Sequence, residues 1–205
     1  MVRFFIVLAV LCGLSANAKA HPHAWIDLET TVVFDDAGLV KGLRVGWLFD
    51  DFYSAFSLDG VKPTQDALNI LAETNLKNLS EYDYFTQITA DGKKLATQKV
   101  TDYHTELRGK RLWLEFFVPL ESGVDPKKSK LTYAVFDPTY YVEILHAETG
   151  DPIRLEGQAK GCGYRLTPPQ PPEDISLMAA AMDQTQTAGD TIGDYFAEHV
   201  TLRCQ

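Results

Sequence analysis

Hydrophobic and polar residues alternate along much of the chain, which is the pattern of β-strands with one buried face. The alternation covers residues 24–34 and 39–49, and the sequence "DDAG" between them (Asp35 to Gly38) is typical of a turn. We therefore predict that the chain opens with a β-hairpin. Strand-like patterns return from residue 84 onward, in residues 85–107 with Asp91-Gly92 as a turn, and in residues 110–120, 130–147 and 199–204.

One segment has a different period. Residues 63–82 begin with Pro63-Thr64, contain no glycine and place Ala67, Leu68, Leu71 and Leu79 at partial helical spacing. We predict one helix here, with a break near Asn75, and two short helices within residues 175–186 and 190–200. Spaced strands with one inserted helix favour a mainly β, antiparallel β-sandwich-like domain. The alternative is an open α+β sheet covered by that helix.

The first twenty residues have the composition of a secretory signal peptide. Met1-Val2-Arg3 carries a positive charge, residues 4–14 are almost entirely apolar, and Ala18-Lys19-Ala20 is an A-x-A cleavage site. The apolar run is shorter than the roughly 20 residues that cross a bilayer. We expect cleavage after Ala20, localisation in the periplasm, a mainly β domain over residues 21–166, and a proline-rich linker with a C-terminal segment over residues 167–205 packed on the same domain.

Two cysteines remain after such a cleavage, Cys162 and Cys204. An even pair in an exported protein usually forms a disulfide, so we predict one here, tying the C-terminal segment to the body. Without residues 1–20 the chain has 17 basic and 28 acidic side chains, a net charge of −11 (17 − 28). Phosphate repels such a surface, which excludes a general nucleic-acid binder.

The sequence "HPHAWID" at the expected new N-terminus carries the clearest candidate chemistry. In an extended chain His21, His23, Trp25 and Asp27 lie on one face, because side chains alternate. Two imidazoles and a carboxylate at this spacing are ligands for first-row transition metals, and cleavage would add a terminal amine at His21. We predict a metal site at His21, His23 and Asp27. The alternative is an exposed polar terminus with no bound ion.

The proline between the two histidines restricts the metal geometry. The square-planar motif for copper and nickel uses the deprotonated backbone nitrogen of the second residue, and Pro22 has no N–H to lose. A tetrahedral zinc site tolerates the proline, so zinc is favoured over nickel or cobalt. A copper brace, made by the amine and ring of His21 with a second histidine, stays open.

Further ligands would come from elsewhere in the chain. His104 follows Asp102 by two residues, and His146 follows Glu143 by three, so both histidines are candidate metal ligands. His199 is a weaker candidate. Asp137 begins an Asp-Pro-Thr turn, and we interpret it as structural.

Four segments together resemble one bacterial family of small periplasmic proteins: "HPHAWID", "WLFDDFYS", "FDPTYYVEI" and "FAEHVTLRC". The family is described as an ABC-transport-like periplasmic component, occurs with membrane permeases of the NicO nickel/cobalt type, and is linked to zinc supply. The resemblance implies a metal-handling accessory to a transporter. His21 and His23 carry over as its site residues, with Asp27 as a weaker match.

The residues and the resemblance together favour a periplasmic metal-binding protein without enzymatic activity. Sequence motifs of serine hydrolases, zinc peptidases and phosphate-binding loops are absent from the chain. Two alternatives stay open: a copper-dependent redox enzyme at His21, and a subunit that docks to a transporter without binding metal.

Overall fold

The computed structural model describes residues 22–181 and 192–205, so the predicted signal peptide and His21 lie outside the described residues. The strands are β1 Ala24–Phe34, β2 Val40–Phe49, β3 Thr86–Ala90, β4 Lys93–Lys94, β5 Tyr103–Arg108, β6 Arg111–Val124, β7 Leu131–Val135, β8 Val142–His146, β9 Ile153–Glu156, β10 Cys162–Thr167 and β11 His199–Cys204. The helices are α2 Asp51–Ser57, α3 Gln65–Leu79, η1 Ser80–Phe85, α4 Glu173–Ala181 and η2 Ile192–Phe196.

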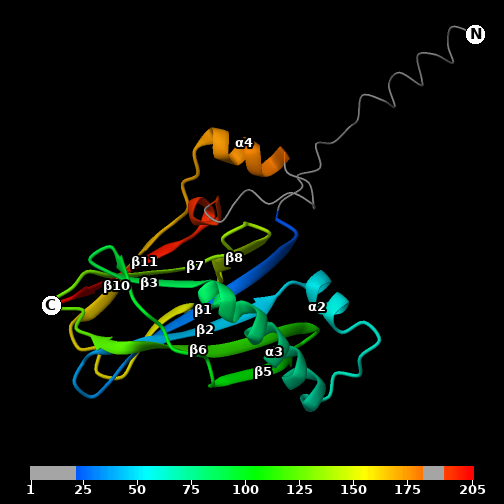
Figure 1. Ribbon diagram of the computed structural model, residues 1–205, viewed down its shortest axis with the longest axis horizontal. Coiled ribbons are helices and arrows are strands. Elements are labelled where there is room, and N and C mark those ends of the chain that lie inside the picture. The colour runs from blue at the N-terminus through cyan, green and yellow to red at the C-terminus, as the bar shows by residue number, and fades with distance from the viewer. Residues whose placement is uncertain (1–21, 182–191) are drawn as a thin grey trace, which may run out of the picture.

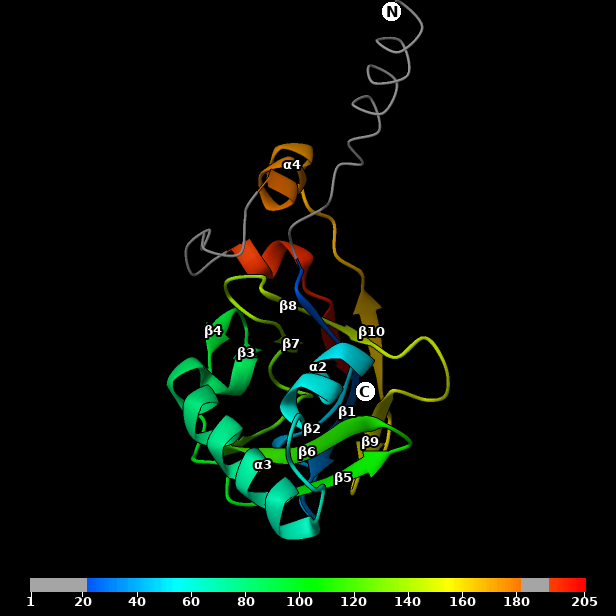
Figure 2. The ribbon, with the colours of Figure 1, turned by 90° about the vertical axis from the view of Figure 1, so that its right-hand side faces the viewer.

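The strands form two sheets with a shared core (Figures 1 and 2). The first sheet has the order β5-β6-β2-β1-β8, and β9 also pairs with β1; the second has the order β10-β11-β7-β3-β4. Most neighbours are antiparallel, but β8 and β9 both run parallel to β1, along its first and second halves. The predicted mainly β, sandwich-like fold with an inserted helix is confirmed.

Residues from both sheets and from α3 fill the core. The largest fully buried side chains include Trp47, Phe116 and Tyr133. The α3 residues Leu68, Ala72 and Leu76 belong to the same apolar cluster, and Gln65 Nε2 at the start of α3 donates to the Thr105 carbonyl of β5. The helix thus covers the side of the sandwich next to β5.

The predicted first hairpin forms because its turn residues satisfy their own backbone. Asp35 Oδ1 accepts hydrogen bonds from the Ala37 and Leu39 N–H groups at 3.0 and 2.9 Å. Gly38 has a φ of +77°, a conformation that costs glycine little. These contacts set the register in which Ile26 of β1 lies opposite Phe49 of β2.

Two helical features differ from the sequence prediction. The helix α3 continues through Asn75 without the predicted break. The residues after β2 form the short helix α2, which was not predicted. Asp50 caps α2, because its Oδ1 accepts from the Tyr53 N–H at 2.8 Å while its Oδ2 accepts from the Trp25 N–H at 2.9 Å. One carboxylate therefore joins the start of α2 to β1.

The end of η1 has an unusual backbone. Asp83, Tyr84 and Phe85 all have φ between +50° and +55°, a region that non-glycine residues rarely occupy. Tertiary contacts hold this turn: the buried Tyr84 hydroxyl accepts from the Val100 N–H at 3.1 Å, and Asp83 forms an ion pair with Lys94 at 2.6 Å. The turn places Phe85 between α3 and β3.

The C-terminal segment joins the body in two ways. Cys162 of β10 and Cys204 of β11 lie opposite each other and form the predicted disulfide. A small second apolar cluster joins Ala179 of α4, Ile192 of η2 and Tyr140 of the β7–β8 loop. Figures 1 and 2 show α4 outside the two sheets. Within residues 22–181 and 192–205, every helix is too short or too polar to cross a membrane.

Candidate metal site at the start of β1

The predicted site residues that the structure describes begin on β1. Ala24, Ile26 and Leu28 point into the core, whereas Trp25 and Asp27 lie on the outer face and are each about half exposed. His23 comes just before the strand, at the position that continues this outer face by alternation. The predicted alternation at this end of the chain is therefore present.

The neighbouring strand β8 adds a carboxylate to this face. The His23 N–H donates to the Tyr141 carbonyl at 2.9 Å, and their rings lie 4.7 Å apart between centroids. In the same parallel register Trp25 lies beside Glu143. Glu143 therefore lies on the strand next to β1, beside the residue that separates His23 from Asp27. The sequence pattern did not predict Glu143 as a ligand.

An acidic cleft of about 460 Å³ adjoins this end of β1 and β8. Its lining includes one imidazole, His146, and four carboxylates: Asp27, Glu143, Glu148 and Glu198. Asp27 forms an ion pair with Arg111 at 2.8 Å, which offsets one of the four negative charges. The remaining charge makes the cleft attractive to cations. The structure thus brings two predicted residues, Asp27 and His146, to one cleft.

His146 belongs to a buried hydrogen-bond network between the two sheets. Its Nδ1 lies 2.8 Å from Glu198 Oε2, and its Nε2 lies 3.0 Å from Thr30 Oγ1, which is 2.7 Å from the Tyr133 hydroxyl. Because a carboxylate can only accept, we assign the Nδ1 proton to the bond with Glu198 and let Nε2 accept from Thr30. Both ring nitrogens are occupied, so a metal ion would have to displace one of these bonds.

The environment of Glu198 lowers its pKa. Burial on its own would raise the pKa of this carboxyl, but the His146 ring and the His146 backbone N–H, at 2.7 Å, hold the ionised form and outweigh burial. Burial raises the pKa of Tyr133 well above its ordinary value. Glu198 therefore stays ionised, and Tyr133 stays protonated, near neutral pH.

The order carboxylate, imidazole, hydroxyl in this network is that of a nucleophilic triad. Thr30 is only 1% exposed, however, and its hydroxyl also contacts the buried Tyr133. No substrate can approach this hydroxyl without opening the core. The network joins the two sheets, and its burial favours a structural role.

The other predicted histidines lie apart from this cleft. His104 is on β5, exposed, opposite Glu115 and 3.6 Å from Glu106. Three strand spacings separate β5 from β1, which is about 14 Å across the sheet. His199 pairs with Asp194 at 3.3 Å. Asp137, interpreted as structural, accepts from the Thr139 and Val142 N–H groups of its turn.

The described residues, 22–181 and 192–205, contain no cluster of three histidine, cysteine or acidic side chains placed to hold a metal ion. A complete site at this end of β1 needs a further donor, and His21 lies directly before the described chain. Glu143, Glu148 and Glu198 could not be assigned from the sequence, since they meet β1 only through the pairing of β8 and the packing of the C-terminal segment. The one available signal was the spacing of Glu143 and His146.

Comparisons with known proteins found two uncharacterised relatives, one of which matches nearly the whole chain. An uncharacterized protein of Haemophilus influenzae is 27% identical over 204 residues, covering 96% of this chain and 98% of its own length. An uncharacterized 15.5 kDa protein in the trpE 3' region of Spirochaeta aurantia is 31% identical over 86 residues, covering 42% of this chain and 60% of its own. No solved structure matches the chain. A family model matches residues 6–204, and the chain therefore belongs to the family described as a protein of unknown function, DUF1007.

Proposed function

We propose that this protein is a periplasmic metal-binding accessory that captures a divalent transition metal at the start of β1 and supports a membrane permease. Zinc is favoured, with nickel or cobalt as alternatives. One observation carries the proposal: an acidic cleft at this end of β1 combines Asp27 with Glu143, Glu148 and Glu198, and His23 directly precedes the same strand. A negative cleft raises the local concentration of cations, and an adjacent imidazole supplies the nitrogen donor that a transition metal prefers.

The proposed ligands are His21, His23 and a carboxylate from Glu143 or Asp27. Glu143 is the better carboxylate, because Asp27 is already paired with Arg111 at 2.8 Å. Glu143 Oε2 accepts one hydrogen bond from the Tyr140 hydroxyl at 3.1 Å, which orients the carboxylate and leaves its other oxygen available. His21 supplies the third donor, and its terminal amine a possible fourth after cleavage.

We leave the two remaining predicted ligands out of this set. His146 uses both ring nitrogens in the buried network, and His104 lies three strands away. Zinc suits the remaining donors, since a tetrahedral ion accepts imidazole nitrogen, carboxylate oxygen and water, and Pro22 prevents the square-planar nickel motif.

The partner follows from the family resemblance rather than from the geometry. The resemblance seen in the sequence implies a transporter partner, so we propose an inner-membrane permease of the NicO type. A site at the end of a strand, open to a cleft, suits a protein that both takes up and releases its ion. It would be less suited to long-term storage.

Calorimetric titration of the chain that begins at His21 tests the proposal, with zinc, nickel and copper in turn. The variant H21A/H23A should lose zinc binding by at least about a hundredfold, because both nitrogen ligands are removed. The matched control H104A/H199A removes two histidines from elsewhere and should bind zinc like the parent.

Three other outcomes would change the conclusion. If H21A/H23A binds all three metals like the parent, the terminal site is wrong. If only copper binding is lost, the site is a copper brace at His21. If the parent binds no metal while a co-purified permease is still retained, the protein is a docking subunit.

A further inference from the structure

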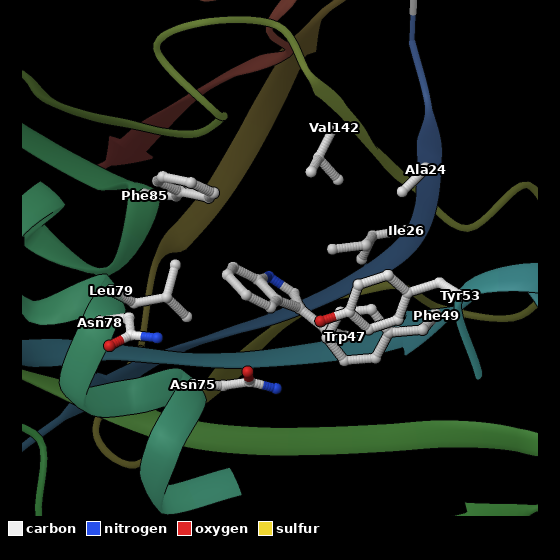
Figure 3. Close-up of a pocket in the computed structure, with 10 residues that line it drawn as sticks. All are labelled: Ala24, Ile26, Trp47, Phe49, Tyr53, Asn75, Asn78, Leu79, Phe85 and Val142. Carbon is white, nitrogen blue, oxygen red and sulfur yellow. The ribbon is translucent and has the colours of Figure 1, made fainter. Parts of the chain in front are cut away.

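The inner face of β1, opposite the proposed metal site, borders an apolar pocket (Figure 3). Its volume is about 160 Å³. Four buried residues of the first sheet form its floor: Ala24, Ile26, Trp47 and Phe49. A cavity of this size with an apolar lining is large enough for a benzene ring.

Partly exposed residues from separate elements surround the pocket. Tyr53 of α2 stacks on Phe49 with centroids 4.7 Å apart, and Phe85, held in its unusual turn, lies across from it. The side chains of Asn75 and Asn78 reach the pocket from α3. All of these side chains are uncharged, so the pocket has no group that would neutralise a charged ligand.

Trp47 places a buried N–H group at the floor of this pocket. Its side chain is 2% exposed, and its Nε1–H, within the part of the chain that the structure describes, has no hydrogen-bond acceptor. Figure 3 shows the indole nitrogen on the side of the ring that faces Ile26 and Val142, toward the pocket. Buried donors in native proteins almost always have a partner, so this one calls for an acceptor that enters from outside.

The neighbours of the indole nitrogen disfavour water as that acceptor. A buried water needs two to four polar partners, whereas Ile26, Val142 and Phe85 around the nitrogen are apolar. An acceptor oxygen carried on an apolar body satisfies the donor and fills the space at once.

We propose that this pocket binds a small uncharged molecule with an aromatic or branched apolar body and one acceptor oxygen, which takes a hydrogen bond from Trp47 Nε1. The volume of the pocket suits a ligand of roughly six to ten heavy atoms. This site lies on the opposite face of β1 from the proposed metal ligands and does not depend on metal binding.

Two probe molecules of the same shape separate the hydrogen bond from simple filling of the pocket. Acetophenone carries a carbonyl oxygen, and α-methylstyrene carries a methylene group in its place. Acetophenone should bind about three- to tenfold more tightly, the range expected for one neutral hydrogen bond. Benzoate, of similar size but charged, should bind at least tenfold more weakly than acetophenone. Titrations followed by calorimetry and by the indole N–H resonances of the three tryptophans give these affinities.

Two matched variants locate the donor. W47F keeps an aromatic ring and removes the N–H, so the two probes should then bind equally. W25F makes the same change on the outer face and should keep the parent preference. The Trp47 indole resonance, which is missing in W47F, should move downfield with acetophenone only.

Several results would overturn the proposal. Equal binding of acetophenone and α-methylstyrene to the parent would show that the indole N–H has no role. If neither probe binds at millimolar concentration, the pocket is not a ligand-binding site. If W47F does not fold, the comparison of probes on the parent still decides, with the Trp25 resonance assigned from W25F as the unshifted reference.

Discussion

Two regions of this molecule combine histidine with carboxylate groups, and they differ in what surrounds the imidazole. His146 is 8% exposed, bonds to Glu198 through one nitrogen and to Thr30 through the other, and lies between the two sheets. His23 lies at the start of β1, partly exposed, beside Tyr141 and near Glu143 on the outer face. The same residue types thus occur once in the interior and once at an open strand end.

The difference shows how burial determines the use of a histidine. An imidazole in the core must form hydrogen bonds within the protein through both ring nitrogens, so neither nitrogen is available to bind a metal ion. His23 lies just before β1 in a partly exposed position, so a change in its contacts should affect the core less than a change at His146. A substitution in one of these two regions can therefore be compared with the other region as its reference.

The largest expected effect is on stability. H146A would leave the Glu198 carboxylate without its imidazole partner, and Thr30 and Tyr133 without theirs, so the free energy of unfolding should fall by about 3–5 kcal/mol. Urea unfolding at pH 7 measures it. H104A, at an exposed position, should stay within about 0.5 kcal/mol of the parent. If the free energy of unfolding of H146A falls by less than about 1 kcal/mol, the network is not structural. If H146A folds but no longer binds zinc, His146 is a metal ligand.

The second-largest expected effect is a fall in zinc affinity as the pH is lowered. Imidazole must be neutral to bind, and an unperturbed histidine titrates near pH 6.5. Between pH 7.5 and pH 5 the neutral fraction falls about 30-fold, so zinc affinity should drop about 30-fold for one histidine ligand and about a thousandfold for two. Calorimetric titration with zinc across this pH range therefore shows whether one or two histidines bind the ion. An affinity that stays constant down to pH 5 points to carboxylates alone and rejects the site.

A smaller effect is expected on acid stability. The lowered pKa of Glu198 means that its ionised form stabilises the folded protein, so this contribution is complete above the ordinary value of 4.5 and is lost as pH falls through the folded pKa. E198Q should cost about 1–2 kcal/mol at pH 7 and flatten the loss of stability below pH 4.5. Urea unfolding at pH 7, 5, 4 and 3 measures both. The control E148Q changes an exposed carboxylate of the same cleft and should keep the parent profile.

The smallest expected effect compares the two carboxylates of the outer face. E143Q should weaken zinc binding on the order of tenfold, whereas D27N should weaken it about twofold, because Arg111 already pairs with Asp27. Both variants should keep the stability of the parent within about 1 kcal/mol. Calorimetric titration with zinc ranks them, and a larger loss for D27N would exchange the roles of the two residues.

The sequence pattern predicted those elements whose own residues decide them. Alternation and the Asp35-to-Gly38 turn predicted the first hairpin, and the cysteine pair predicted the disulfide. The helix α2 was not predicted, because its seven residues are too few to show a helical period and its cap, Asp50, also bonds to Trp25. Nor does alternation reveal that β8 and β9 run parallel to β1, since parallel pairing depends on the path of the intervening chain.

The residues of the candidate site were likewise predicted only in part. The prediction of His23 and Asp27 on one face came from their two-residue spacing. The cleft depends on contacts between distant segments: Glu143 reaches β1 through β8, and Glu198 reaches His146 across 52 residues. Whether His146 was exposed or buried depended on those contacts as well, so its residue type alone could not separate a ligand from a structural residue.

The position of β1 inside its sheet has a consequence for how the chain folds. This strand precedes all others in sequence, yet Ala24 pairs with Val142 and Thr30 with Ile153, more than a hundred residues later. Such a high contact order makes folding slow, because the loop entropy is lost before the contacts form. The face that carries His23 and Asp27 acquires Glu143 only when β8 docks. The complete neighbourhood of these residues therefore requires the chain up to β8 to be present and paired with β1.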